Sequence, residues 1–476
     1  MHASLKIVWS ILFSLSFLYI KGADTLFVDH SSGDYNLTSN YLSIFRDSSR
    51  TFEIEDLIRE DKAHWFRPPE STNPHAFDPQ ANYWVRFTVK GKVLTQKGWI
   101  LEAADPRINE IAVFYKKTSG KMAKEKAGML YTFDQKPYQH KNFVFELPND
   151  QEQFTFYVQI KSSTQSALLF RIRSFEFFTF YALYEYYLLG LFYGILAIMS
   201  LYNLLLYFTF KESLYLYYTL YVASCILITF AEDGLGFHFI WGKIPELNYF
   251  VFNISPLLFL VSFAVYSISF LELRQRLPFI YKGILFFTGL TCLYFIIKIL
   301  RGHYGWNVTA YILPFTLIYI GGLVRWRQNF RPAGYFVIAY TFTIAAVYIT
   351  ALRINKFLEW DNIFTIYILN FSLVVEVLLL SLAQADRFRQ IKLDKERVQE
   401  EAIGKLQELN LIKDRINREI EARVDLQTKE LREKKEIIEL QNHDLSKANE
   451  QLKRQAEEIS RMNQLLSQQK EALEVN

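Results

Sequence analysis

Hydrophobic and polar positions divide the chain into three regions with different periodicities. Residues 24–175 contain short runs in which every second side chain is apolar, the clearest being Tyr83, Val85, Phe87 and Val89. Period-two alternation is typical of a strand with one buried face. Four further runs of this kind, separated by turn sequences rich in small and polar residues, predict an antiparallel β-sandwich for the region.

In residues 180–386 the alternation gives way to seven long apolar segments. They lie near 184–209, 214–231, 249–270, 281–300, 308–324, 333–352 and 362–384. Each approaches the roughly 20 residues that a helix needs to cross the hydrocarbon core of a bilayer. The pattern therefore predicts a seven-helix transmembrane bundle.

Residues 387–476 change character again, because they contain no proline and a single aromatic residue, Phe388. An aliphatic residue occupies every seventh position: Val424, Leu431, Ile438, Leu445, Leu452, Ile459, Leu466 and Leu473. A sustained heptad repeat predicts a coiled coil. Two positions of each heptad form the seam between the helices of a coiled coil. The second of these positions is mostly polar here, for example Gln441 and Gln455, so a single solvated helix remains the alternative.

The first 23 residues have the features of a signal peptide. Lys6 precedes an apolar stretch from residue 7 to 20, and Gly22 and Ala23 offer small side chains near a cleavage point. Lys21 is unfavourable at such a point, and an uncleaved anchor helix is the alternative. Either way, residues 1–23 predict export of the β region.

Basic residues are distributed unequally between the loops on the two sides of the predicted bundle. One set contains nine: Lys211, Arg274, Arg276, Lys282, Arg325, Arg327, Arg331, Arg387 and Arg389. The other contains four: Lys243, Arg301, Arg353 and Lys356. Cytoplasmic loops carry the excess of Lys and Arg. The β region is therefore expected outside and the C-terminus in the cytoplasm, in agreement with the signal peptide.

Composition excludes several other classes of protein. The net charge is only +4, and no basic patch alternates with aromatic residues, which argues against a nucleic-acid groove. Both cysteines, Cys225 and Cys292, lie in apolar runs, which excludes a disulfide framework and a cysteine-rich metal site. No cofactor or metal ion is expected.

A few residues are candidates for ligand binding or signal relay. Glu376 lies within the seventh apolar segment, where an ionisable side chain usually faces the bundle interior; snorkelling to the interface is the alternative. Asn203 could donate a hydrogen bond between helices, commonly a structural role. Trp65, Trp84 and Trp99 could stack on a sugar, although aromatic residues of a sandwich more often belong to its core.

One motif in the third region resembles part of a catalytic site. His443 and Asp444 resemble the phosphoacceptor box of a histidine kinase, but the residues that follow contain no glycine-rich nucleotide loop. We therefore expect His443 to be a surface residue of the coil and the chain to have no catalytic residues.

Several stretches together resemble a known family. They are residues 189–196, 201–204, 215–218, 234–237 and 375–387 in the apolar region, and 82–87 and 141–145 in the polar region. They are similar to the bacterial seven-transmembrane receptors with diverse intracellular signalling modules (7TMR-DISM), with that family's second type of extracellular domain. The resemblance implies a jelly-roll-like outer domain that binds carbohydrate or another small ligand. It also implies a cytoplasmic kinase, cyclase or phosphatase module; no such module follows the predicted coil, so we expect no enzymatic output from this chain.

The sequence thus predicts a receptor in the inner membrane of a bacterium. We expect an extracytoplasmic ligand, a lipid-embedded homodimer, and a coiled coil that acts on a separate cytoplasmic kinase, cyclase or phosphatase. One alternative is a sensor kinase or diguanylate cyclase that has lost its catalytic domain by truncation or gene splitting. A transporter is another, although charges within the helices are sparse and no internal repeat is evident.

Overall fold

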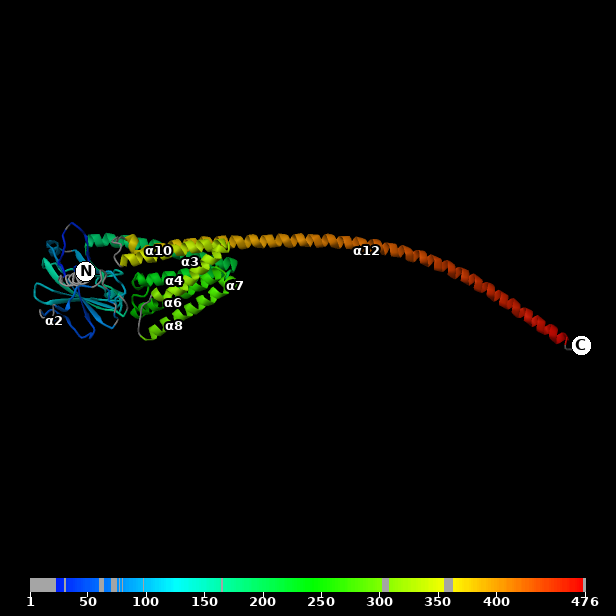
Figure 1. Cartoon of the computed structure of the whole chain (residues 1–476), viewed down its shortest axis with the longest axis horizontal. Helices are drawn as coiled ribbons and strands as arrows, with labels where there is room; N and C mark the ends of the chain where they lie inside the picture. The colour runs from blue at the N-terminus through cyan, green and yellow to red at the C-terminus, as the bar shows by residue number, and fades with distance from the viewer. Residues whose placement is uncertain are drawn as a thin grey trace, which may run out of the picture. The chain divides into compact units, whose positions relative to one another are not determined.

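The computed structural model describes residues 23–473 except for 30, 60–63, 70–74, 77, 79, 97, 164–165, 302–307 and 355–362. The predicted signal peptide, apart from Ala23, and Lys356 lie outside the described residues. The chain forms two compact units, Met1–Arg387 and Phe388–Asn476. Strands and helices of the first unit and the single helix of the second are drawn in Figure 1.

The N-terminal part of the first unit is a β-sheet domain. Its larger sheet has the order β1 (Leu26–Phe27), β5 (Asn82–Lys90), β10 (Gln153–Lys161), β7 (Glu110–Lys116) and β8 (Met122–Ala127), with β3 (Ser43–Asp47) also paired to β5. The second sheet has the order β2 (Asp34–Leu37), β12 (Phe170–Ser174), β6 (Trp99–Ala103) and β9 (Phe143–Glu146). A two-stranded ribbon pairs β4 (His75–Ala76) with β11 (Ser166–Ala167). Short helical turns are α2 (Ile54–Leu57), η2 (Lys92–Thr95) and η3 (Phe133–Gln135).

Apolar side chains from both sheets form one core. The ring of Phe87 on β5 stacks on Phe156 of β10, with centroids 5.3 Å apart, and lies 5.9 Å from Phe170 on β12 of the other sheet. Val85 and Val89 are also buried. The alternation at residues 83–89 therefore marks the face of β5 that packs into this core, and the predicted N-terminal β-sheet domain is confirmed.

The rest of the first unit is helical. Its elements are α3 (Phe175–Phe210), α4 (Ser213–Glu232), α5 (Leu235–Phe239), α6 (Pro245–Phe270), α7 (Leu273–Arg276), α8 (Pro278–Leu300), η4 (Val308–Tyr311), α9 (Ile312–Arg327), α10 (Arg331–Ile354), α11 (Ile363–Ile366) and the beginning of α12 (Ile368–Leu473). Helices α3, α4, α6 and α8 follow one another as packed neighbours (Figure 1).

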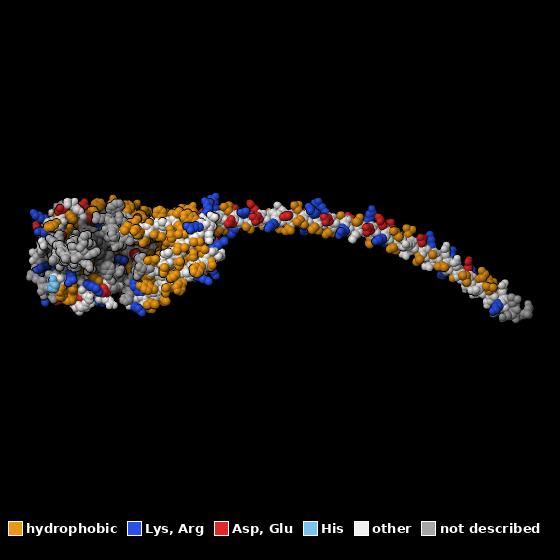
Figure 2. All heavy atoms as spheres, viewed as in Figure 1, with side chains coloured by type: hydrophobic (Ala, Val, Ile, Leu, Met, Phe, Trp, Pro, Cys, Tyr) orange, Lys and Arg blue, Asp and Glu red, His pale blue; other side chains and the backbone are white. Residues whose placement is uncertain are grey.

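Within the described ranges, six helices are long and apolar enough to cross a membrane: α3, α4, α6, α8, α10 and α12. Helix α9 occupies the position of the predicted fifth span, but it has only 16 residues after the 3-10 turn η4. The series of apolar helices is confirmed, and the count of seven stays a prediction. Hydrophobic side chains cover the visible surface of these helices (Figure 2), as a lipid-facing surface requires.

Helix α3 begins farther upstream than the apolar pattern predicts. It starts at Phe175 rather than near residue 184, and it follows strand β12 directly. The hydroxyl of Ser174 accepts the backbone N–H of Phe177 and caps the helix. Phe178 packs against Ile100 and Val144 of the β domain. The first turns of α3 are therefore part of the contact between strands and helices.

The second unit is the remainder of α12. The described part of α12 is one helix as far as Leu473, and the seam residues from Val424 to Leu466 are all exposed in the single chain. Figure 2 shows acidic and basic side chains interspersed with apolar ones along this helix. The predicted long helix is confirmed, whereas its pairing into a coiled coil stays a prediction.

Candidate functional site

A buried ion pair joins the β domain to helix α3. Lys141, between η3 and β9, places its Nζ 3.3 Å from Oε1 of Glu185, and both side chains are almost completely buried. Tyr367, between α11 and α12, donates its hydroxyl to the same carboxylate at 2.5 Å. One carboxylate on α3 therefore contacts both the β domain and the residue that precedes α12.

The charges of this cluster are set by burial and by one another. Burial opposes the charge on Lys141, but the Glu185 carboxylate raises the pKa of Lys141 well above its ordinary value. Burial, and then the charge on Lys141, lowers the pKa of His140 to about 3, so His140 is neutral near pH 7. Its Nε2 has no hydrogen-bond partner among the described residues and lies 3.8 Å from Oε2 of Glu185. Removing either member of the Lys141–Glu185 pair would leave the other charge buried and unpaired.

The segment that carries Lys141 is held by polar contacts on both sides. The amide of Asn142 donates to Oε1 of Glu102 at 2.6 Å, and the other carboxylate oxygen of Glu102 accepts from Arg173 at 2.5 Å. The backbone N–H of Lys141 donates to the hydroxyl of Tyr186 on α3 at 3.0 Å. The strands therefore fix the position from which Lys141 reaches α3.

The connection between α4 and α6 closes against the same part of the β domain. Gly234 has φ +73° between α4 and α5, and a Cβ there would lie 2.7 Å from the Cβ of Pro106. Only glycine fits both this conformation and this distance. The backbone N–H of Phe133 in η3 donates to the carbonyl of Gly242 at 2.8 Å, and the Phe133 ring stacks on His238 of α5. The contact thus involves both backbone and side chains.

A second polar cluster lies among the apolar helices. Glu376 of α12 is 2% exposed and accepts hydrogen bonds from the hydroxyls of Tyr221 on α4 and Thr343 on α10. The neighbouring Tyr218 of α4 donates to the carbonyl of Val377 at 2.5 Å. Glu376 therefore faces the interior and ties α12 to two other helices.

A third cluster surrounds Glu272, in the turn between α6 and α7. Its Oε2 lies 3.1 Å from Nη2 of Arg325 on α9. The Nε of Arg325 also donates to the carbonyl of Leu271 at 2.8 Å. On the α12 side, Arg387 donates to the carbonyl of Ser269 at 3.2 Å and to Glu272. The turn thus binds two helices through one carboxylate.

The second and third clusters have helix α12 in common. Along α12, Asn370 donates to Asp233 at the end of α4, and Glu376 accepts from Tyr221 and Thr343. Farther along, Gln384 donates to Tyr266 of α6, and Arg387 donates to Glu272. A hydrogen bond between membrane helices contributes only ~0.6 kcal/mol on average. Individual bonds along α12 can therefore be exchanged at low cost.

The three predicted ligand-binding tryptophans lie apart. Trp84 is 1% exposed and packs on Phe114, and Trp99 is 6% exposed in the sandwich core. Trp65 is half-buried and lines a surface hollow of about 620 Å³ with, among others, Phe45 and Phe52. Of the three, only Trp65 offers a face to a ligand.

Asn203 does not connect helices as Glu376 does. Asn203 is buried, and its amide donates to the carbonyl of Met199 on its own helix rather than to another helix.

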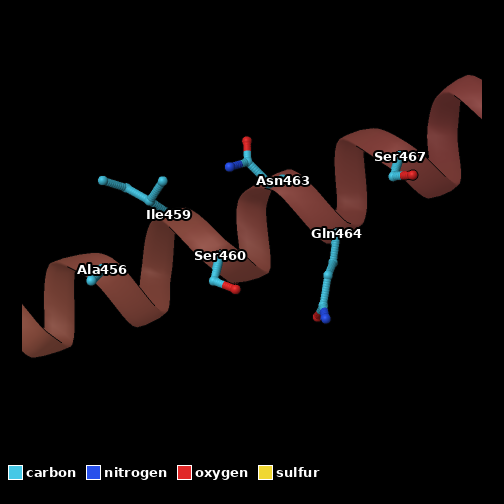
Figure 3. A pocket seen from close by; sticks show the side chains of 6 residues that line it. All are labelled: Ala456, Ile459, Ser460, Asn463, Gln464 and Ser467. Atoms are coloured by element: carbon cyan, nitrogen blue, oxygen red, sulfur yellow. The ribbon is translucent and has the colours of Figure 1, made fainter.

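A groove on the second unit, lined by Ala456, Ile459, Ser460, Asn463, Gln464 and Ser467, is an open face of one helix (Figure 3). Among the described residues, no group of three or more His, Cys, Asp and Glu side chains could hold a metal ion.

Sequence reasoning missed the cluster around Glu185. A signal was available, because Glu185 is an acidic residue within an apolar helix, and the rule that selected Glu376 applies to it equally. Lys141 gave no such signal, since a lysine next to a polar turn is ordinary. Its partner is defined only once the β domain and α3 are brought together.

A β-sheet domain in contact with a series of apolar helices defines a membrane protein that carries a separate β domain. The model of the 7TMR-DISM extracellular domain of the second type matches residues 39–174, and the model of the seven-transmembrane domain with diverse intracellular signalling matches residues 185–387. The chain therefore belongs to the 7TMR-DISM receptors, as its motifs predicted. No curated protein matches the sequence.

Proposed function

We propose that this chain is a bacterial signal-transduction receptor in which the β domain senses an extracytoplasmic ligand and α12 carries the response to the cytoplasm. The observation that supports this most directly is the position of Glu185. Its carboxylate contacts Lys141 of the β domain and Tyr367, which immediately precedes α12. A displacement of the Lys141 segment must therefore alter a contact at the beginning of the output helix.

The ligand is a carbohydrate or another small molecule with a face that stacks on aromatic rings. The hollow beside Trp65 supports this, because Phe45 and Phe52 provide apolar surface while Arg46 and Arg67 provide hydrogen-bond donors. Such a ligand shifts the receptor between two states only if it binds them unequally.

The output is a parallel homodimeric coil that acts on a separate cytoplasmic kinase, cyclase or phosphatase. The exposed aliphatic seam from Val424 to Leu466 supports pairing, since a lone helix of this length buries little apolar surface. The excess of basic residues in one set of loops supports a cytoplasmic C-terminus and an inner-membrane location.

Charge exchange between Lys141 and Glu185 tests whether the β domain relays its signal to α12. Leu445→Cys in the seam reports coil pairing by disulfide formation between receptors in native membranes. Lys141→Glu and Glu185→Lys should each change the cross-linked fraction, because each places like charges together in a buried site. The double exchange should restore the original fraction. Lys121→Glu, on an exposed turn, is the matched control.

Two outcomes would contradict the relay. One is a cross-linked fraction that neither single exchange alters while both receptors reach the membrane at normal abundance. The other is a double exchange that deviates as strongly as the single changes do. The non-enzymatic part is tested separately: purified receptor incubated with ATP or GTP should acquire no label on His443 and make no cyclic dinucleotide.

A further inference from the structure

A second buried lysine lies beside the Lys141–Glu185 pair. The Nζ of Lys136 donates to the carbonyls of His140 at 3.0 Å and of Lys141 at 2.9 Å, and the residue is 6% exposed. None of its hydrogen bonds among the described residues goes to a carboxylate. Two carbonyl groups compensate a buried ammonium only in part for the loss of water.

Three aromatic rings complete the surroundings of Lys136. Its Nζ lies 4.7 Å from the ring centre of Phe133, 4.5 Å from that of Phe143 and 5.7 Å from that of Phe237. Phe133 and Phe143 belong to the β domain, whereas Phe237 belongs to α5. Rings at these distances attract an ammonium and offset part of the loss of water. The ammonium is enclosed from both sides of the contact between strands and helices, and separating them would restore its full hydration.

Other titratable groups face this site from each neighbouring element. Lys141 is near enough to repel the Lys136 ammonium, and the Glu185 carboxylate is already engaged by Lys141 and Tyr367. Asp233, at the end of α4, accepts from Tyr193 and Asn370. On α5, burial and then the charge of Lys136 lower the pKa of His238. The acidic residue of η3, Asp134, is exposed.

We propose that the contact between η3 and the α4–α6 connection is a proton-responsive latch, which is closed when Lys136 is neutral and loosened when Lys136 is charged. The latch makes proton concentration a second input to the receptor. It acts on the contact between the β domain and the helices, and it does not depend on which ligand or effector the receptor has.

The direction of the pH effect follows from the pKa of Lys136 in the two arrangements. Burial, and then the charge of Lys141, lowers this pKa to about 7 in the closed contact. A water-exposed lysine has a pKa of about 10.4. The closed form therefore binds fewer protons, and closure is favoured as pH rises from about 7 to about 10.4. The closed-to-open ratio changes by up to about tenfold per pH unit in this window and is insensitive to Lys136 outside it.

The pKa values of the neighbouring groups Lys141 and His140 lie outside the range from pH 7 to 9. Lys141 has a pKa raised well above 10.5 in the closed contact and one of about 10.4 in water, so it remains charged in both arrangements between pH 7 and 9. His140 has a pKa of about 3 in the closed contact, compared with about 6.5 in water, so it weakens closure only between pH 6.5 and 3. A pH response between 7 and 9 is thus specific to Lys136.

Hydrogen–deuterium exchange of the full-length receptor in lipid nanodiscs at pH 7, 8 and 9 tests the latch, with labelling times scaled to the intrinsic exchange rate. Protection of residues 130–142 and 234–244 should rise with pH, approaching about tenfold per unit in the steepest part. Lys136→Met, which is neutral and of similar length, should give high protection at every pH. Lys121→Met should retain the pH response of the unaltered receptor.

Two results would overturn the latch. One is protection in the unaltered receptor that does not change between pH 7 and 9. The other is a Lys136→Met receptor that keeps the same pH dependence as the unaltered one, which would assign the response to another group. Lys136→Arg, permanently charged, should show low protection at all three pH values. If the arginine variant does not fold, the methionine variant alone still decides between the outcomes.

Discussion

Arg387 of helix α12 places its Nη2 3.3 Å from Oε1 of Glu272 in the turn between α6 and α7. Glu272 adopts φ +55°, a left-handed conformation that is unfavourable for a residue with a side chain. The contact therefore combines an ion pair with a strained turn. It is the last polar contact of α12 within the first unit, so it can report whether α12 has moved.

Removal of the Glu272 charge should loosen this end of α12. Glu272→Gln leaves Arg325 and Arg387 without their common carboxylate. We expect a loss of about 1–3 kcal/mol in the free energy of unfolding, less than for a fully buried pair because the Glu272 side chain is 29% exposed. Thermal unfolding of the purified receptor measures the loss. Arg276→Gln is the control, since its 3.9 Å contact with Glu272 is exposed and should contribute at most about 1 kcal/mol.

Loss of one hydrogen bond to Glu376 should have a small effect. Tyr221→Phe removes a hydroxyl that donates to the carboxylate, and we expect it to destabilise the receptor by ~0.6 kcal/mol. Glu376→Ala should cost more, because it also leaves the Thr343 hydroxyl and a void in the packed interior. Equal effects of the two substitutions in detergent unfolding experiments would argue against a shared carboxylate. Tyr294→Phe, at a partly exposed position on α8, should have no measurable effect.

Polar residues at the second seam position should make the coil marginally stable. Gln441→Leu together with Gln455→Leu should raise the melting temperature of a 400–476 fragment and hold the receptor's output in one state. Leu445→Pro should abolish pairing, because it breaks the helix and removes a seam residue. Circular dichroism and sedimentation over a range of concentrations measure both effects. A fragment that stays monomeric at high concentration would instead identify the coil as a docking helix for a different protein.

Loop charges predict which positions an impermeant thiol reagent reaches in intact cells. After replacement of Cys225 and Cys292, a cysteine at Arg276 or Arg327 should be protected, and a cysteine at Lys243 should react. All three side chains are exposed in the structure, so a difference in labelling reports the side of the membrane rather than burial. Labelling in the reverse order would invert the orientation.

Periodicity alone determined the three regions of this protein. Alternation at residues 83–89 predicted which face of β5 packs into the core between the two sheets, the apolar segments predicted most of the helices, and the absence of proline predicted an uninterrupted helix after Arg387. Such patterns are local, because a strand repeats every two residues and a helix every 3.6, and each element needs only one apolar surface to bury.

Contacts between distant residues required the tertiary structure. Burial of Trp84 beside Phe114, exposure of part of Trp65 and the bond of Asn203 within its own helix depend on packing that spacing does not encode. The start of α3 at Phe175 depends on the strands against which Phe178 packs. Lys136 is an ordinary polar residue in the sequence. It becomes a titratable group with a pKa of about 7 only because the β domain and α5 together exclude water from its ammonium.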